Sequence, residues 1–111
     1  MPPYQLWIEA EEWVPSSWDP RDTNSDVIAT FGDGTRWVAS FFSYANITTL
    51  VTRWRASGEH LHGMYFWSSD MILIDEVSRL QIERVVAHLI DDQTFEHIFT
   101  QLESDDDLNA E

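Results

Sequence analysis

The feature that most constrains this chain is a nearly unbroken apolar run over residues 64–77, which reads MYFWSSDMILIDEV. Short apolar runs that are rich in aromatic and branched residues and bounded by turn-forming residues are typical of buried strands. The Ser-Ser-Asp triplet in its middle predicts a tight turn, and therefore a central β-hairpin of strands 64–67 and 71–75. Strands this apolar need cover on both faces from neighbouring strands and helices.

A second strand pair is predicted over residues 26–31 and 35–43. The Gly-Asp-Gly segment that joins them contains an Asp-Gly turn, which between β-rich segments is a strong hairpin signal. Both faces of segment 35–43 carry apolar side chains, so this strand is expected to be internal to the sheet. An earlier strand is predicted within residues 4–13, and residues 14–25 form a loop because they are rich in Pro, Ser, Asp and Asn.

Three helices are predicted from apolar residues at helical spacing. The first has Asn46 as its N-cap and Gly58 at its left-handed C-terminal position. The second opens at Ser78 with a capping box, and the third is capped by Asp91 and Asp92. The three apolar stripes are Ile47, Leu50, Val51 and Trp54; Ile82, Val85, Val86, Leu89 and Ile90; and Phe95, Ile98, Phe99 and Leu102.

The expected order of elements is β-β-β-α-β-β-α-α. This order indicates an α+β domain with a mostly antiparallel sheet of about five strands and three helices. With 111 residues the chain has the length of one domain, which we place at residues 1–103, followed by a disordered acidic tail at 104–111. No signal peptide pattern is present, and no stretch reaches the roughly 20 apolar residues needed to span a bilayer, so a cytoplasmic protein is expected.

Charge is the strongest compositional signal. The chain has 20 acidic residues and 6 basic residues, all of them Arg, which gives a net charge of −14. The acidic excess lies at the two ends, because residues 34–90 are neutral and residues 91–111 carry no basic residue. Such a field repels nucleic acid and anionic membranes and attracts cationic partners. Acidity also keeps a protein soluble or adapts it to a salty cytoplasm, and the sequence leaves that reading open.

Candidate metal ligands are few. The absence of Cys excludes thiolate sites and a cysteine nucleophile. His60 and His62 would share one face of a strand, and they could chelate a metal ion if Glu59, Asp70 or Asp75 supplied a third ligand. No H-E-x-x-H pattern is present, and two histidines at the exposed entry to a strand are the simpler interpretation. No cofactor is therefore expected.

Candidate catalytic clusters have structural interpretations as well. Ser68, Ser69 and Asp70 look like an active-site cluster, yet Ser and Asp also make tight turns, and no G-x-S-x-G motif occurs. Asp75 and Glu76 could act as a carboxylate pair, but acids also favour a helix N-terminus. We therefore expect no enzymatic activity.

The acidic C-terminal region offers a binding surface instead of a reaction. Aromatic anchors ringed by acids suit the capture of a basic protein, such as a nuclease whose substrate groove is rich in Lys and Arg. Trp18 lies on the predicted loop, where it is either a lid over the core or a binding anchor. The predicted partner-binding residues are Trp18, Asp91, Asp92, Glu96, Asp105, Asp106 and Asp107.

The chain resembles a known group of small proteins in its size, its acidity and its six Trp residues. The resemblance also rests on two strand-rich segments, WVASFFSY and YFWSSDMILIDEV. The chain is similar in style to the small acidic α+β immunity proteins that bacteria encode beside polymorphic or contact-dependent toxins. This resemblance implies inhibitory binding of a cognate, nuclease-like toxin. The alternatives are a DNA-mimic inhibitor from a phage or mobile element, and a small metal-dependent enzyme that uses His60 and His62. A homodimer through an exposed strand edge is a further option.

Overall fold

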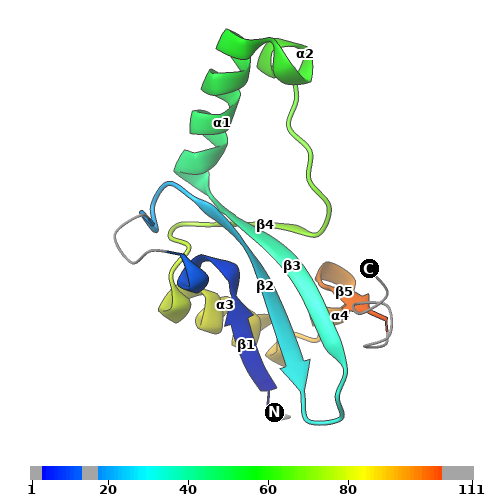
Figure 1. Ribbon diagram of the computed structural model, residues 1–111. Helices are drawn as coiled ribbons and strands as arrows, with labels where there is room; N and C mark the ends of the chain where they lie inside the picture. The colour runs from blue at the N-terminus through cyan, green and yellow to red at the C-terminus, as the bar shows by residue number, and fades with distance from the viewer. Residues whose placement is uncertain (1–3, 14–17, 104–111) are drawn as a thin grey trace.

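The computed structural model describes residues 4–13 and 18–103, which form a sheet with helices on one face and a projecting arm (Figure 1). The strands are β1 (Tyr4–Ile8), β2 (Asn24–Phe31), β3 (Arg36–Ser43), β4 (Met71–Ile74) and β5 (Thr100–Leu102). Their order is β1-β2-β3-β4, and β5 also pairs with β3. Among these pairings β3–β4 is parallel and the others are antiparallel. The predicted α+β class with a five-stranded, mostly antiparallel sheet is confirmed.

The helical elements are η1 (Glu9–Glu12), α1 (Tyr44–Ser57), α2 (Glu59–Gly63), α3 (Arg79–Asp91) and α4 (Phe95–Ile98). Ser78 caps α3 as predicted, because its side chain accepts a hydrogen bond from the Gln81 amide. The left-handed Gly58 ends α1, also as predicted. The N-cap of α1 is Ser43 and not Asn46, because the chain turns into the helix directly from β3 and the Ser43 side chain accepts the Asn46 amide.

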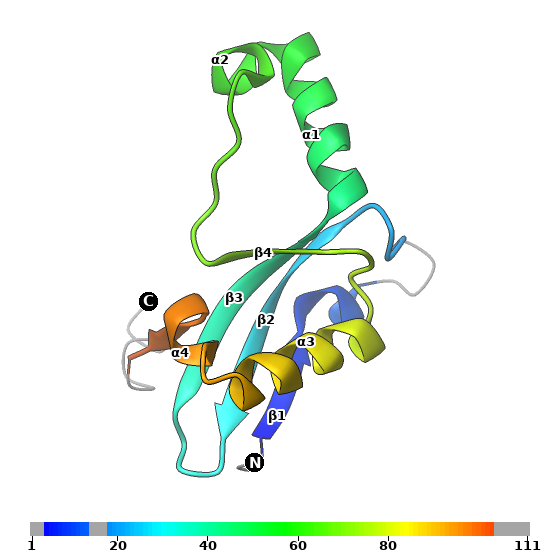
Figure 2. The same cartoon turned by 180° about the vertical axis from the view of Figure 1, so that it is seen from behind.

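The hydrophobic core lies on one face of the sheet. The predicted β2–β3 hairpin is confirmed, with Val27 opposite Ala39. Alternation along the strands turns Val27, Ala39 and Phe41 inward, where they are fully buried. Helices α3 and α4 cover this face (Figure 2), and Ile82 and Val86 of α3 join the same core. In the described ranges, no helix is long and apolar enough to cross a membrane.

The predicted hairpin over residues 64–75 is wrong. Strand β4 is present, but it pairs in parallel with Ser40–Ser43 of β3, and residues 64–67 lie outside any described strand. The cause is the path of the chain, because α1 carries it away from the end of β3 and residues 64–70 bring it back alongside (Figure 1). A strand that returns in this way runs parallel to the one it left.

Two other elements end earlier than predicted. The first strand stops at Ile8 and continues as η1, where the Ala10 amide donates to the buried Ser25 hydroxyl. The third helix stops at Ile98, and the chain then forms β5. Strand β4 covers only the second half of β3, so the first half is free to pair with β5. An available strand edge thus overrides the helical spacing of the sequence.

Candidate functional site

Surface hollows gather around the turn between β2 and β3, at the end of the sheet opposite α1 (Figure 1). We call this region the hairpin end, and define it as residues 31–37, 90–98 and 101–103. Strands β2 and β3 bring the turn there, α3 brings its C-terminus, and α4 and β5 follow directly. Segments far apart in the sequence therefore supply one surface.

An apolar hollow of about 410 Å³ lies between the turn and α4. Phe31, Trp37 and Phe95 form its floor. The rings of Phe31 and Trp37 meet Phe95 edge-on, with centroids 5.5 and 5.7 Å away. Phe95 itself is buried and stacks on Phe99 at 4.3 Å. Rings held from several sides in this way form a firm apolar floor.

Glu96 stands at the border between this hollow and a second one of about 590 Å³. The second hollow shares Phe31 and Phe95 with the first and adds Gln93 and His97. Glu96 is exposed in the first turn of α4, so its carboxylate is hydrated and adjoins both hollows. One acidic group therefore borders both hollows, the apolar one and the more polar second one.

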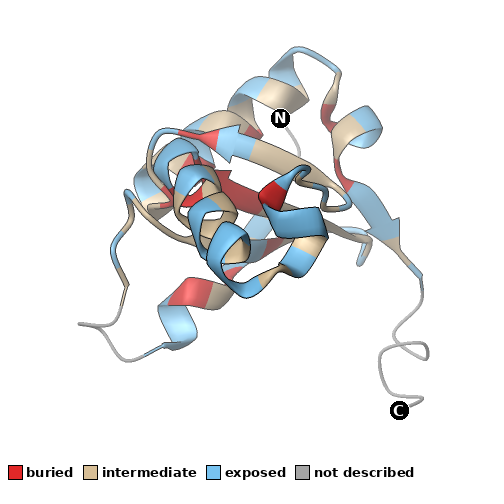
Figure 3. Ribbon diagram, turned by 90° about the horizontal axis from the view of Figure 1, so that it is seen from above, coloured by how far each residue is buried: buried red, intermediate tan, exposed pale blue. Residues whose placement is uncertain are grey.

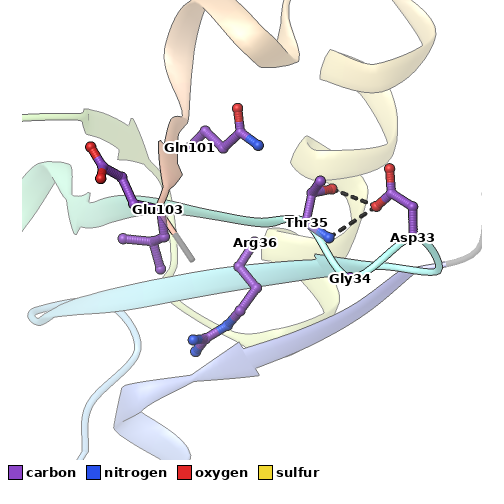
Figure 4. Close-up of a pocket in the computed structure, with 7 residues that line it drawn as sticks. Asp33, Gly34, Thr35, Arg36, Gln101 and Glu103 are labelled. Carbon is purple, nitrogen blue, oxygen red and sulfur yellow. Dashed lines mark hydrogen bonds between the residues drawn. The ribbon is translucent and has the colours of Figure 1, made fainter. Parts of the chain in front are cut away.

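A polar hollow of about 580 Å³ lies on the other side of the same turn, between the turn and β5 (Figure 4). Asp33 and Glu103 lie on its opposite sides, and Arg36 and Gln101 are also part of the lining. The Asp33 carboxylate accepts hydrogen bonds from the Thr35 hydroxyl at 2.7 Å and from its amide at 2.9 Å. These hydrogen bonds hold the pKa of the Asp33 carboxyl below its ordinary value, and the bond from the Thr35 hydroxyl has the larger effect. The group is therefore ionised at neutral pH.

The hairpin end is strongly negative. Its exposed carboxylates belong to Asp33, Asp91, Asp92, Glu96 and Glu103. The predicted contacts Asp105, Asp106 and Asp107 follow β5 in the sequence but lie outside the described residues. Apolar hollows rimmed by hydrated carboxylates can take a cationic side chain that has an apolar stem.

Trp18 lies away from these acids. It is half-buried and packs against the hydrophobic core, and its indole Nε1 has no hydrogen-bond partner among the described residues. Its segment is tied to the N-terminal end of α3, because the Val77 amide donates to the Pro20 carbonyl at 2.7 Å. Asp91 lies at the other end of this helix, roughly 20 Å away at 1.5 Å per residue. The structure thus brings Asp91, Asp92 and Glu96 to one region and places Trp18 elsewhere.

His60 and His62 do not lie on a strand, so the predicted shared strand face is wrong. They belong to α2, a single turn in which His60, Leu61 and His62 have left-handed backbone angles with φ of 53–59°. The His60 ring stacks on Trp54 with centroids 3.8 Å apart. Among the described residues, no group of three His, Asp or Glu side chains is arranged to hold a metal ion.

The Ser-Ser-Asp triplet directly precedes β4 and does not form a hairpin turn between two strands. Asp70 has a φ of 54°, its carbonyl accepts the Ser40 amide at 2.8 Å, and its carboxylate accepts the Thr100 hydroxyl. Asp70 therefore links the start of β4 to the start of β5 along the edge of β3. Near α3, Glu76 forms an ion pair with Arg21 at 3.1 Å.

Sequence reasoning missed part of the hairpin end. The sequence pattern predicts only a turn and its flanking strands at Phe31, Asp33 and Trp37. A signal was present, since Asp33 lies on a loop with aromatic residues on both sides, and loops commonly carry recognition. Comparisons with protein-family models, curated proteins and solved structures found no match to this chain.

Proposed function

We propose that this chain is a non-enzymatic binding protein that neutralises a basic protein, and that this partner is a cognate, nuclease-like bacterial toxin. The observation that carries the proposal is the acid-rimmed aromatic hollow beside α4. Its floor of Phe31, Trp37 and Phe95 offers apolar contact and ring faces, and Glu96 supplies a charge at its border. A binding protein of this kind needs no catalytic group.

The chemistry of the hollow selects for Arg or Lys on the partner. The guanidinium of an Arg can lie over an aromatic ring while it pairs with a carboxylate. Asp33, Glu96 and Glu103 surround the turn, so several basic side chains can be engaged at once. The net charge of −14 also attracts a basic protein over a distance and accelerates association.

A DNA-mimic inhibitor is the second candidate in the binding class. Ordered, exposed carboxylates at Asp33, Glu96 and Glu103 support it as well. The aromatic floor favours the protein-anchor mode, because phosphate mimicry needs only charge. Trp37→Leu distinguishes the two modes, because it removes one aromatic ring of the floor and keeps every carboxylate. The protein-anchor mode then loses affinity for the captured partner, whereas a DNA mimic keeps it.

The test is affinity capture with the full chain from a lysate of its source organism, followed by titration of the captured protein. Glu96→Lys is compared with Glu12→Lys, because both residues are exposed acids and Glu12 lies in η1, outside the hairpin end. We expect Glu96→Lys to weaken binding at least tenfold, or about 1.4 kcal/mol, and Glu12→Lys to weaken it by less than about threefold. Partners that are all acidic or neutral, or equal effects of the two variants, would overturn the proposal.

A further inference from the structure

The arm comprises α1, α2 and the connection to β4, residues 44–70, and it stands away from the sheet (Figures 1 and 2). The main contacts of α1 are with α2 and β3. Its apolar stripe, with Leu50, Val51 and Trp54, is only half-buried. Seen from above (Figure 3), α1 and α2 are mostly exposed or intermediate in burial. An amphipathic helix normally buries its stripe, so this one lacks cover.

Large apolar side chains are exposed at α2 and in the connection that follows it. Leu61 is 63% exposed, Met64 78%, Tyr65 50% and Trp67 74%. They fall within seven residues of sequence at α2 and the start of the connection. Single exposed apolar residues are normal on a protein surface, but a cluster of four marks an interaction site.

The cluster is held in place by the arm itself. His60 and Phe66 both stack on Trp54, and Phe66 meets Phe42 of β3 edge-on at 5.3 Å. Gly63 lies so close to α1 that a Cβ would come within 2.7 Å of the Val51 carbonyl oxygen. The left-handed backbone at residues 60–62 is strained, and such strain persists only where the surroundings enforce it. The arm thus presents the cluster in a defined conformation.

Charge indicates what can cover this cluster. Residues 44–70 contain Arg53, Arg55, Glu59 and Asp70, so the arm is neutral and the rest of the chain carries the whole charge of −14. The hairpin end lies at the opposite end of a molecule 46 Å long (Figure 1). At physiological salt, charges are screened beyond roughly 8 Å. Two copies that meet at their arms therefore keep their acidic ends apart, whereas contact through the bodies would bring acids together.

We propose that a second copy of this chain covers the cluster, so that the protein is a symmetric dimer joined arm to arm. In a two-fold arrangement the same patch serves both copies, and Leu61, Met64 and Trp67 of one copy pack against those of the other. Burial of these side chains drives the pairing. Both hairpin ends remain free at the two poles of the dimer, and the proposal does not depend on the function assigned to them.

Sedimentation over a range of concentrations and salt tests the dimer. Leu61→Ser is paired with Leu80→Ser, because Leu80 is 66% exposed on α3 and lies outside the arm. We expect Leu61→Ser to raise the dimer dissociation constant at least about tenfold and Leu80→Ser to leave it within about twofold. Added salt is expected to leave the dimer intact or tighten it, since no ion pair between acids and bases holds it. Circular dichroism confirms that both variants fold.

Cross-linking gives a second measurement that does not depend on affinity. Because the chain has no Cys, Leu61→Cys and Leu80→Cys each introduce one thiol. Mild oxidation is expected to link Leu61→Cys into covalent dimers and to leave Leu80→Cys monomeric. A wild-type chain that stays monomeric throughout the micromolar range overturns the proposal. The proposal is also overturned if the Leu61 and Leu80 variants behave alike. It is overturned as well if the chain forms open-ended oligomers that salt suppresses, as expected for head-to-tail contact between the arm and the hairpin end.

Discussion

Two helices of nearly equal length, α1 and α3, differ in how far the fold buries their apolar faces. Helix α3 lies on the sheet and buries Ile82 and Val86 completely, whereas the one buried residue of α1 is the polar Asn46. Both helices have apolar residues at helical spacing, and both start at a serine N-cap. The comparison shows that periodicity specifies a helix and its apolar face, but not the surface that covers this face.

The difference separates a stable body from a weakly supported arm. In the body, strands, helices and core residues reinforce one another around Phe41. The arm depends on local ring stacking around Trp54 and on polar contacts at its base. At the base of the arm, the Asp22 carboxylate accepts hydrogen bonds from the side-chain amide of Asn46 at 3.0 Å and from the Thr49 hydroxyl at 2.9 Å. We expect the arm of a single, unpaired copy to open locally while the body stays folded.

The largest expected effect comes from the core of the body. Phe41 is fully buried and meets Phe99 at 6.2 Å, so Phe41→Ala should lower the free energy of unfolding by about 3–5 kcal/mol. Trp54→Ala, in the half-buried stripe of α1, should cost less and should speed amide hydrogen exchange in the arm alone. Urea unfolding and hydrogen exchange measure the two effects. Equal losses at both sites would show that arm and body form one cooperative unit.

A smaller effect is expected at the glycine that ends α2 and packs against α1. Gly63 has a φ of 76° and no room for a Cβ beside the Val51 carbonyl oxygen, so Gly63→Ala should disrupt the arm. Gly34 has a φ of 90° in open space, and Gly34→Ala should cost only the backbone strain, about 1–2 kcal/mol. Hydrogen exchange should show lost protection in α1 for the first variant and unchanged protection for the second. Intact α1 amides in Gly63→Ala would contradict this close packing.

The smallest expected effect is a pH dependence at the base of the arm. Hydrogen bonds from Asn46 and then Thr49 lower the pKa of Asp22, so its ionised form is favoured in the folded state. This contribution to stability is present above the unfolded pKa, about 3.9, and is lost as the pH falls through the lower folded value. Exchange of α1 amides should therefore accelerate in acid.

The matched variants for this effect are Asp22→Asn and Asp33→Asn. Asp22→Asn should destabilise the arm at neutral pH and flatten the acid dependence of its amide exchange. Asp33→Asn removes a carboxylate whose pKa is also lowered, but at the hairpin end, so the arm should keep its wild-type acid dependence. If both variants change the acid dependence of amide exchange in the arm equally, the pH effect comes from the net charge of the protein and not from the Asp22 hydrogen bonds.

Local signals determined much of this protein. The β2–β3 hairpin, the Ser78 cap and the Gly58 terminus follow from residues close in sequence, because turns and caps are local hydrogen-bonding arrangements. The acidity of residues 91–103 also follows directly from the sequence. Asp91, Asp92 and Glu96 were identified as a candidate surface from composition and helical spacing alone.

Only the tertiary structure decided the rest. Residues 64–67 have the composition of a strand but find no strand partner in the described chain, and Thr100–Leu102 have helical spacing but pair with β3. The joining of Phe31, Trp37 and Phe95 beneath Glu96 depends on α4 folding back to the β2–β3 turn. The physical reason is that strand pairing and the covering of apolar faces depend on which edges and faces the assembled chain leaves open, and contacts between distant residues set those.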